Sequence, residues 1–213
     1  MTYRELDEES TRVARVMVSS AGGNLQRGDR AVLVYPPSLD FMIAFLACLK
    51  AGVVAVPVFP PNPTRRDTLL MFSKIVDGAE AKVAFTNGEY NYMKKMAGIT
   101  QVFGKLKNKG TSAWPDNLKW VLTDTTTKLS TADSFQIVDP DPSDIAFLQY
   151  TSGSTSDPKG VMITHANLGH NLSIITNELK ATADTIVVSW VSCLFHIFYR
   201  TRIDGFAHCF SQV

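Results

Sequence analysis

Hydroxyl, glycine and lysine residues are concentrated in one short stretch, residues 150–160, which reads YTSGSTSDPKG. Hydroxyls and free backbone N–H groups can donate hydrogen bonds to phosphate oxygens, and a lysine can neutralise phosphate charge. The stretch therefore predicts a loop that binds a polyphosphate. Its candidate ligands are Thr151, Ser152, Gly153, Ser154, Thr155, Lys159 and Gly160. Composition alone leaves an alternative open, because Ser- and Gly-rich surface hairpins are common and bind nothing.

The order of these residues excludes the two best-known nucleotide loops. The Walker pattern requires glycine, four residues, then Gly-Lys-Ser/Thr. Counting from Gly153, Pro158 occupies the position of the second glycine, and Gly160 follows Lys159 where a hydroxyl residue should stand. The glycines are also too sparse for the dinucleotide pattern G-x-G-x-x-G. A different phosphate-binding motif is needed.

Residues 150–160 resemble the signature Y-T-S-G-S/T-T-G-x-P-K-G of the adenylate-forming superfamily, which includes acyl-CoA synthetases, peptide-synthetase adenylation domains and luciferases. Of the ten fixed positions nine match, and Ser156 stands where the family usually has glycine. A serine there adds strain if the position needs a positive φ. Residues 161–168 resemble the V-x-x-(S/T)-H-x-N-L continuation, and residues 55–61 resemble the V-P-V-(Y/F)-P-P stretch of fatty-acyl-AMP ligases. The resemblance therefore points to that branch.

The resemblance implies a reaction, its cofactors and its partners. Fatty-acyl-AMP ligases use ATP and Mg²⁺ to convert a fatty acid or other carboxylate into an acyl-adenylate, with release of pyrophosphate. By resemblance, Lys159 would contact the ATP phosphates or the departing pyrophosphate. The acyl group would then pass to an acyl carrier protein or to CoA. No catalytic residue is assigned, because the resemblance gives no position here to the family's adenine- and ribose-binding residues, its magnesium-binding glutamate or its adenylation lysine.

The resemblance covers residues 2–190, and we expect two segments. Residues 1–190 would form a partial AMP-binding N-terminal domain, and residues 191–213 form a tail that lacks the family's Leu-Pro-x-x-His-Asp segment. We therefore expect a truncated N-terminal fragment that is inactive in isolation. The alternative is a non-catalytic, adenylation-like module that binds phosphate or a protein partner. A more remote alternative is an unrelated phosphate-binding α/β protein.

The elements around the loop alternate between strands and helices. Helices are expected at about residues 3–20, 38–50, 65–76, 89–96 and 166–180, and strands at 30–35, 53–58, 82–86, 118–123, 144–150, 161–164 and 186–190. Thr2 with Glu5 forms a capping-box pattern, Ser38 is a candidate N-cap, and Gly52 follows a helix end. The alternation predicts an α/β fold of layered, mostly parallel sheets flanked by helices. By resemblance, this is an incomplete N-terminal domain of an adenylate-forming enzyme.

Composition narrows the class of protein. Apolar residues make up 45% and charged residues 19%, with a formal charge of +1, so no bulk charge favours nucleic acid. Cys48, Cys193 and Cys209 suit neither a disulfide framework nor a metal site, which favours a reducing, cytoplasmic location. The apolar residues 41–59 contain Lys50, a glycine and a proline, and therefore predict no membrane span.

The other polar and aromatic candidates have simpler interpretations. The four histidines show no metal-ligand spacing, and no metal ligand is predicted. His165 is expected to cap or pack near a helix start, and Tyr150 to be a core or strand-end aromatic. Asp157 would place a carboxylate near the phosphate site, at a position that varies in the signature.

Overall fold

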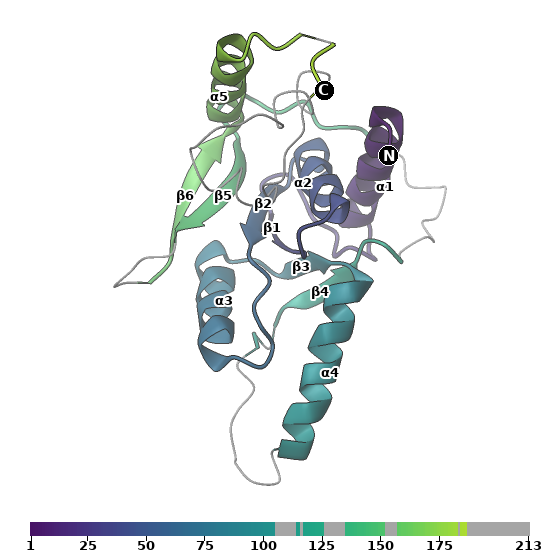
Figure 1. The fold of residues 1–213 in the computed structure, drawn as a ribbon, viewed down its shortest axis with the longest axis vertical. Helices are drawn as coiled ribbons and strands as arrows, with labels where there is room; N and C mark the ends of the chain where they lie inside the picture. The colour runs from purple at the N-terminus through teal and green to yellow at the C-terminus, as the bar shows by residue number, and fades with distance from the viewer. Residues whose placement is uncertain (105–113, 116, 126–134, 152–156, 183, 187–213) are drawn as a thin grey trace.

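Six strands form one sheet in the computed structural model, which describes residues 1–104, 114–115, 117–125, 135–151, 157–182 and 184–186. The strands are β1 (Arg30–Val34), β2 (Val54–Val58), β3 (Val83–Thr86), β4 (Lys119–Leu122), β5 (Ile145–Thr151) and β6 (Lys159–Thr164). Their order is β4-β3-β1-β2-β5-β6 (Figure 1). Strands β1 to β5 pair in parallel, whereas β6 pairs antiparallel to β5. The expected mostly parallel α/β fold is confirmed.

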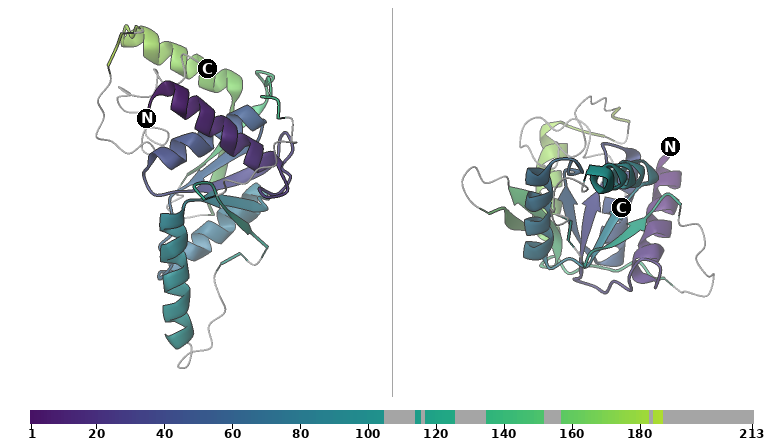
Figure 2. Two further views of the ribbon diagram at one scale, coloured as in Figure 1. Left: turned by 90° about the vertical axis from the view of Figure 1, so that its right-hand side faces the viewer. Right: turned by 90° about the horizontal axis from the view of Figure 1, so that it is seen from below.

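Helices cover both faces of this sheet. They are α1 (Tyr3–Val18), α2 (Leu39–Ala51), α3 (Arg66–Ala79), α4 (Gly88–Gly104) and α5 (His165–Glu178). The chain moves from β1 to β2 in one direction and from β2 back past β1 to β3 in the other. Since such crossovers are right-handed, α2 and α3 must lie on opposite faces. Figure 2 shows α1 and α2 on one side of the sheet and α3 and α4 on the other.

The core is accordingly divided into two layers by the sheet. Along β1, Ala31 and Leu33 pack with α1 and α2, whereas Val32 and Val34 pack with α3. This alternation follows from the two-residue period of a strand. Because both faces are covered, the central strands are apolar throughout, and β1 and β2 are almost entirely buried.

Two of the three cap signals named in the sequence are present in the structure, and the third is not. The Glu5 N–H donates to Thr2 Oγ1 (3.2 Å) and the Thr2 N–H to Glu5 Oε2 (2.6 Å), so the capping box is present. Helix α2 ends at Gly52, whose φ of 67° is the left-handed conformation expected of a C-cap glycine. Ser38 occupies the N-cap position but makes no capping bond, and its hydroxyl is buried without a partner among the described residues.

Helix α4 is much longer than the sequence predicted. It runs from Gly88 to Gly104, whereas the pattern predicted a helix only over residues 89–96. The glycine at position 98 lowers helix propensity, and this concealed the continuation. Tyr90 is buried near the start of α4 and packs on the layer that holds α3.

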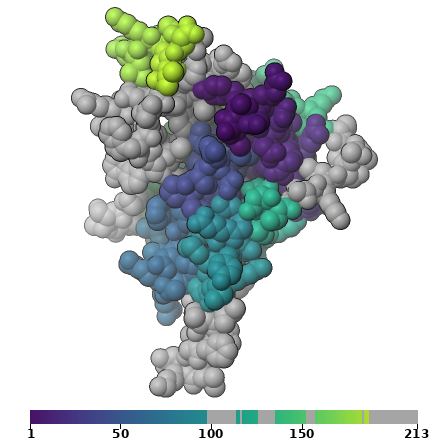
Figure 3. Space-filling view, turned by 45° about the vertical axis from the view of Figure 1, so that its right-hand side comes forward, coloured from purple at the N-terminus to yellow at the C-terminus, as the bar shows by residue number. Residues whose placement is uncertain are grey.

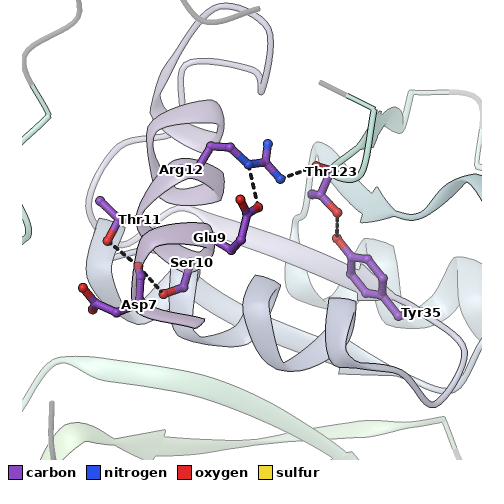
Figure 4. A network of polar contacts seen from close by, with 7 residues as sticks. All are labelled: Asp7, Glu9, Ser10, Thr11, Arg12, Tyr35 and Thr123. Atoms are coloured by element: carbon purple, nitrogen blue, oxygen red, sulfur yellow. Dashed lines mark hydrogen bonds and ion pairs between the residues drawn. The ribbon is translucent and has the colours of Figure 1, made fainter. Parts of the chain in front are cut away.

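Helix α1 is fastened to the carboxyl ends of β1 and β4 by polar contacts (Figure 4). Arg12 donates from Nε to Glu9 Oε2 (2.7 Å) and from Nη2 to the Thr123 carbonyl (2.8 Å). The Thr123 hydroxyl lies 3.0 Å from the Tyr35 hydroxyl. Burial raises the pKa of Tyr35 well above its usual value, so the phenol stays neutral and can share its proton with Thr123.

The apolar residues around α2 form a buried helix and strand. Lys50 is only 4% exposed, and its Nζ donates to the Asp7 carbonyl (2.9 Å), Asp7 Oδ1 (2.6 Å) and Thr11 Oγ1 (2.9 Å). These bonds join α2 to α1, and the two helices lie side by side in Figure 3. Burial also raises the pKa of the Cys48 thiol. Within the part of the chain that the structure describes, no helix is both long and apolar enough to span a bilayer.

Candidate functional site

The candidate phosphate loop joins the antiparallel strands β5 and β6. Thr151 at the end of β5 pairs with Lys159 at the start of β6, so the two ends of the loop are held opposite each other. Both side chains are exposed, and neither has a hydrogen-bond partner in the ranges that the structure describes. A hydroxyl and a cation thus stand together at the mouth of the loop. The candidates Ser152, Gly153, Ser154 and Thr155, together with Ser156, lie outside the described residues.

Gly160 lies in close contact with Tyr150, its partner across the two strands. A Cβ on Gly160 would lie 2.9 Å from Tyr150 Cζ, closer than real Cβ contacts, and 3.1 Å from Tyr150 Cε2, which is tighter than most of them. The absence of a Cβ at Gly160 therefore makes room for the Tyr150 ring. Tyr150 is half-buried, and burial raises the pKa of its phenol while the positive charge of Arg30 opposes the rise.

A groove of about 840 Å³ lies beside the loop, at the carboxyl ends of β2 and β5. Ligand sites of α/β proteins concentrate at such strand ends. Its floor is mostly apolar and comes from the end of β2, the proline-rich residues 59–61 and the inner side of α3. Its lining residues include Val58, Phe59, Pro61, Met71, Phe72, Ile75, Gln149, Tyr150, Thr151 and Pro158. Thr151 and Pro158 lie at the two ends of the phosphate loop, so the groove borders the loop on both sides.

An ion pair on α3 also reaches the loop. Lys74 Nζ contacts Asp157 Oδ1, and both side chains are largely exposed. The Asp157 carboxylate, which the sequence places near the phosphates, is therefore paired with a cation from another element. Lys74 was missed by sequence reasoning because 83 residues separate the two partners and no local pattern links them. Such exposed pairs contribute little stability, so this contact matters mainly as a tie between α3 and the loop.

His165 is the first residue of α5, directly after β6. Thr164 caps this helix, with the Asn167 N–H donating to Thr164 Oγ1 (3.1 Å) and the Thr164 N–H to Asn167 Oδ1 (3.2 Å). Burial lowers the pKa of His165 below its usual value. The negative charge of Asp144 opposes this shift, and the positive charge of Arg27 adds to it. These surroundings accord with a packing histidine at a helix start.

The lowered pKa of His165 makes a prediction about acid stability. Because the unfolded chain binds the proton more readily than the folded one, the imidazole favours folding above about pH 6.5. This contribution is lost as the pH falls from the unfolded pKa through the lower folded pKa. We expect His165→Gln to reduce the fall in melting temperature between about pH 7 and pH 5. Melting curves across that range test this, with His170→Gln on the exposed part of α5 as the matched control. Equal acid sensitivity of His165→Gln and the unsubstituted protein would contradict it.

Among the residues that the structure describes, no group of three or more histidine, cysteine, aspartate or glutamate side chains could hold a metal ion. Lys159 and Thr151 suit the binding of an anion such as a phosphate.

Comparison with known proteins gives consistent matches. A family model described as "AMP-binding enzyme" matches residues 1–204. The medium-chain-fatty-acid–[acyl-carrier-protein] ligase JamA of Moorena producens is 38% identical, over 96% of this chain and 32% of its own length. TtuA of Teredinibacter turnerae, with the same descriptive name, is 32% identical over 90% of this chain and 33% of its own. The chain thus spans about a third of the length of these relatives.

Solved structures agree with these sequence matches. A fatty acyl-adenylate ligase from L. pneumophila, determined with acyl adenylate and pyrophosphate, has a TM-score of 0.67 at 32% identity, covering 90% of this chain and 30% of that one. McyG, solved with phenylalanyl-adenylate, has a TM-score of 0.68 at 20% identity, which shows a shared fold alone. The expected division at residue 190 stays a prediction, since residues 187–213 lie outside the described residues.

Proposed function

Because the chain belongs to the AMP-binding enzyme family, we propose that it supplies the phosphate-binding end of an ATP-dependent ligase for fatty acids. The observation that carries this proposal is the pairing of Thr151 with Lys159 at the mouth of the signature loop. That pairing sets a hydroxyl donor beside a cation that no described residue neutralises. The relatives that activate medium-chain fatty acids support the choice of substrate class.

The reaction joins two anions, which explains the need for such a site. A carboxylate oxygen of the fatty acid attacks the α-phosphorus of ATP, and the bond from that phosphorus to the bridging oxygen breaks. Pyrophosphate leaves with the bond electrons, and the acyl-adenylate remains. Repulsion between the carboxylate and the triphosphate opposes this approach, so positioning and charge neutralisation supply most of the rate.

Within this reaction Lys159 holds the β- and γ-phosphates and stabilises the charge that pyrophosphate gains as it leaves. Thr151, Ser152, Ser154 and Thr155 donate hydrogen bonds to the same oxygens, and Gly153 and Gly160 let the backbone approach them. Bound Mg²⁺ supplies further neutralisation of the phosphates. The acyl group then passes to an acyl carrier protein, as in the named activity of JamA, or to CoA.

Formation of the acyl-adenylate is the direct test of this function. A full-length ligase that contains these 213 residues is incubated with ATP, Mg²⁺ and a medium-chain fatty acid, and the products are examined by mass spectrometry. We expect fatty acyl-AMP and an equal amount of pyrophosphate. ATP hydrolysis to ADP and phosphate, or no ATP consumption with fatty acids of any length, would contradict the proposal.

The 213 residues alone are expected to lack turnover. The family's adenine-binding residues and adenylation lysine are not assigned to any position in them, so the phosphates can be held without the rest of the reacting geometry. ATP–pyrophosphate exchange with added fatty acid should therefore stay at background for this chain. Exchange above background would show that these residues hold a complete site.

A further inference from the structure

We infer that Tyr150 is a positioning residue for the phosphate loop, acting as a wedge between helix α3 and strand β6. Its ring lies between two glycines that come from different elements, Gly78 of α3 and Gly160 of β6. This inference rests on the proposed function, because it concerns the geometry of the same loop. It assigns a role to the residue that precedes the phosphate ligands.

The contacts of the ring are unusually close on both sides. A Cβ on Gly160 would meet the ring carbons Cζ and Cε2 at 2.9 and 3.1 Å, and the hydroxyl oxygen at 3.2 Å. A Cβ on Gly78 would meet the Tyr150 hydroxyl oxygen at 3.2 Å, with the ring carbons further away at 3.8 and 3.9 Å. Both glycines therefore face the hydroxyl, but only Gly160 also faces ring carbons at close range. Neither glycine has a positive φ, so close packing is the physical reason for both.

This arrangement links α3 to the loop at both of its ends. Tyr150 directly precedes Thr151 on β5, and Gly160 directly follows Lys159 on β6. The contact of the ring with Gly160 therefore joins the residues next to the two ends of the loop, where the pairing of β5 with β6 holds Thr151 opposite Lys159. The contact between Lys74 and Asp157 adds a second connection from α3 to the residues just before Lys159. A small displacement of the ring would move both phosphate ligands.

Such a displacement should weaken phosphate binding more than it weakens the fold. Tyr150 is only half-buried, and the hairpin lies at the edge of the sheet. Loop geometry is exacting, because misplacement of binding groups by about 1 Å can cost about 100-fold in rate. Gly78→Ala, in contrast, adds a residue with better helix propensity to α3. Stability and phosphate binding should thus respond in different directions.

The different contacts of the two glycines allow a specific double-substitution test. Gly78→Ala conflicts only with the Tyr150 hydroxyl, so Tyr150→Phe should relieve it. Gly160→Ala conflicts with ring carbons that phenylalanine keeps, so Tyr150→Phe should not relieve it. Gly169→Ala in α5 is the matched control, since an added Cβ there meets no atom within 4 Å.

The single and double variants are made in the full-length ligase that contains these 213 residues. Each is measured by ATP–pyrophosphate exchange and by calorimetric binding of magnesium pyrophosphate. We expect Gly78→Ala to raise the KM for ATP and the Kd for pyrophosphate about tenfold, with no loss of melting temperature. In the Tyr150→Phe background the same substitution should change both by less than about twofold. Gly160→Ala should weaken both about tenfold in either background, and Gly169→Ala should not.

Two outcomes would overturn the inference. Unchanged pyrophosphate affinity in both Gly78→Ala and Gly160→Ala would show that the wedge does not position the loop. An effect of Gly78→Ala that persists in the Tyr150→Phe background would show that the hydroxyl contact is not its cause. Absence of exchange in the unsubstituted protein, with pyrophosphate still bound, would count against the proposed reaction instead.

Discussion

Replacing Lys159 with alanine is expected to slow ATP–pyrophosphate exchange about 100-fold or more in the protein that carries this sequence. Lys159 is exposed at the start of β6 and has no hydrogen-bond partner or ion pair among the described residues, so its charge is available to a ligand. The pyrophosphate that leaves gains negative charge as the bond breaks. A fixed cation therefore stabilises the transition state more than it stabilises the bound ATP.

The same reasoning predicts how the loss divides between kinetic constants. Lys159→Arg keeps the charge but not the compact ammonium, and should retain part of the activity. Lys159→Ala should lower kcat as well as raise the KM for ATP. Lys95→Ala, on the exposed part of α4, removes the same charge away from the loop and serves as the control. An exchange rate for Lys159→Ala within a few-fold of the unsubstituted protein would exclude this role.

Replacing Phe45 with alanine is expected to have the largest effect on stability, a loss of about 3–5 kcal/mol in the free energy of unfolding. Phe45 is 1% exposed on α2, and its ring lies 6.1 Å from that of Phe41 and 5.6 Å from that of Phe147. Phe147 belongs to β5, which leads into the phosphate loop. The cavity would therefore loosen the strand that supports the site as well as the core.

Chemical denaturation followed by intrinsic fluorescence measures this loss. Phe59→Ala removes an equally large side chain that is 73% exposed, and should change the free energy of unfolding by less than about 0.5 kcal/mol. A denaturation midpoint for Phe45→Ala equal to that of Phe59→Ala would show that α2 does not support the sheet in the way described.

Local patterns explain why much of the fold could be predicted from the sequence. The capping box of Thr2 and Glu5 and the helix stop at Gly52 depend on neighbouring residues only, and both are present. The alternation of apolar strands with helices sufficed for the parallel α/β class. The signature loop likewise identified the family, because its residues are consecutive.

Contacts between distant residues explain what the sequence could not predict. The need for glycine at position 160 comes from the ring of Tyr150 across the strand pair, and Gly78 meets the same ring from another helix. Lys74 pairs with Asp157 only because α3 packs beside the hairpin. Ser38 makes no capping bond, and its hydroxyl is buried without a partner among the described residues, which no local pattern indicates.

Binding of pyrophosphate and of AMP to this chain tests the central claim most directly, namely that these residues form the phosphate end of an adenylate-forming site. Calorimetry is performed with magnesium pyrophosphate and with AMP, on the unsubstituted chain and on Lys159→Ala. The account predicts that pyrophosphate binds, that AMP binds much more weakly, and that Lys159→Ala weakens pyrophosphate binding about tenfold or more. Binding of AMP without binding of pyrophosphate, or pyrophosphate affinity unchanged in Lys159→Ala, would contradict it.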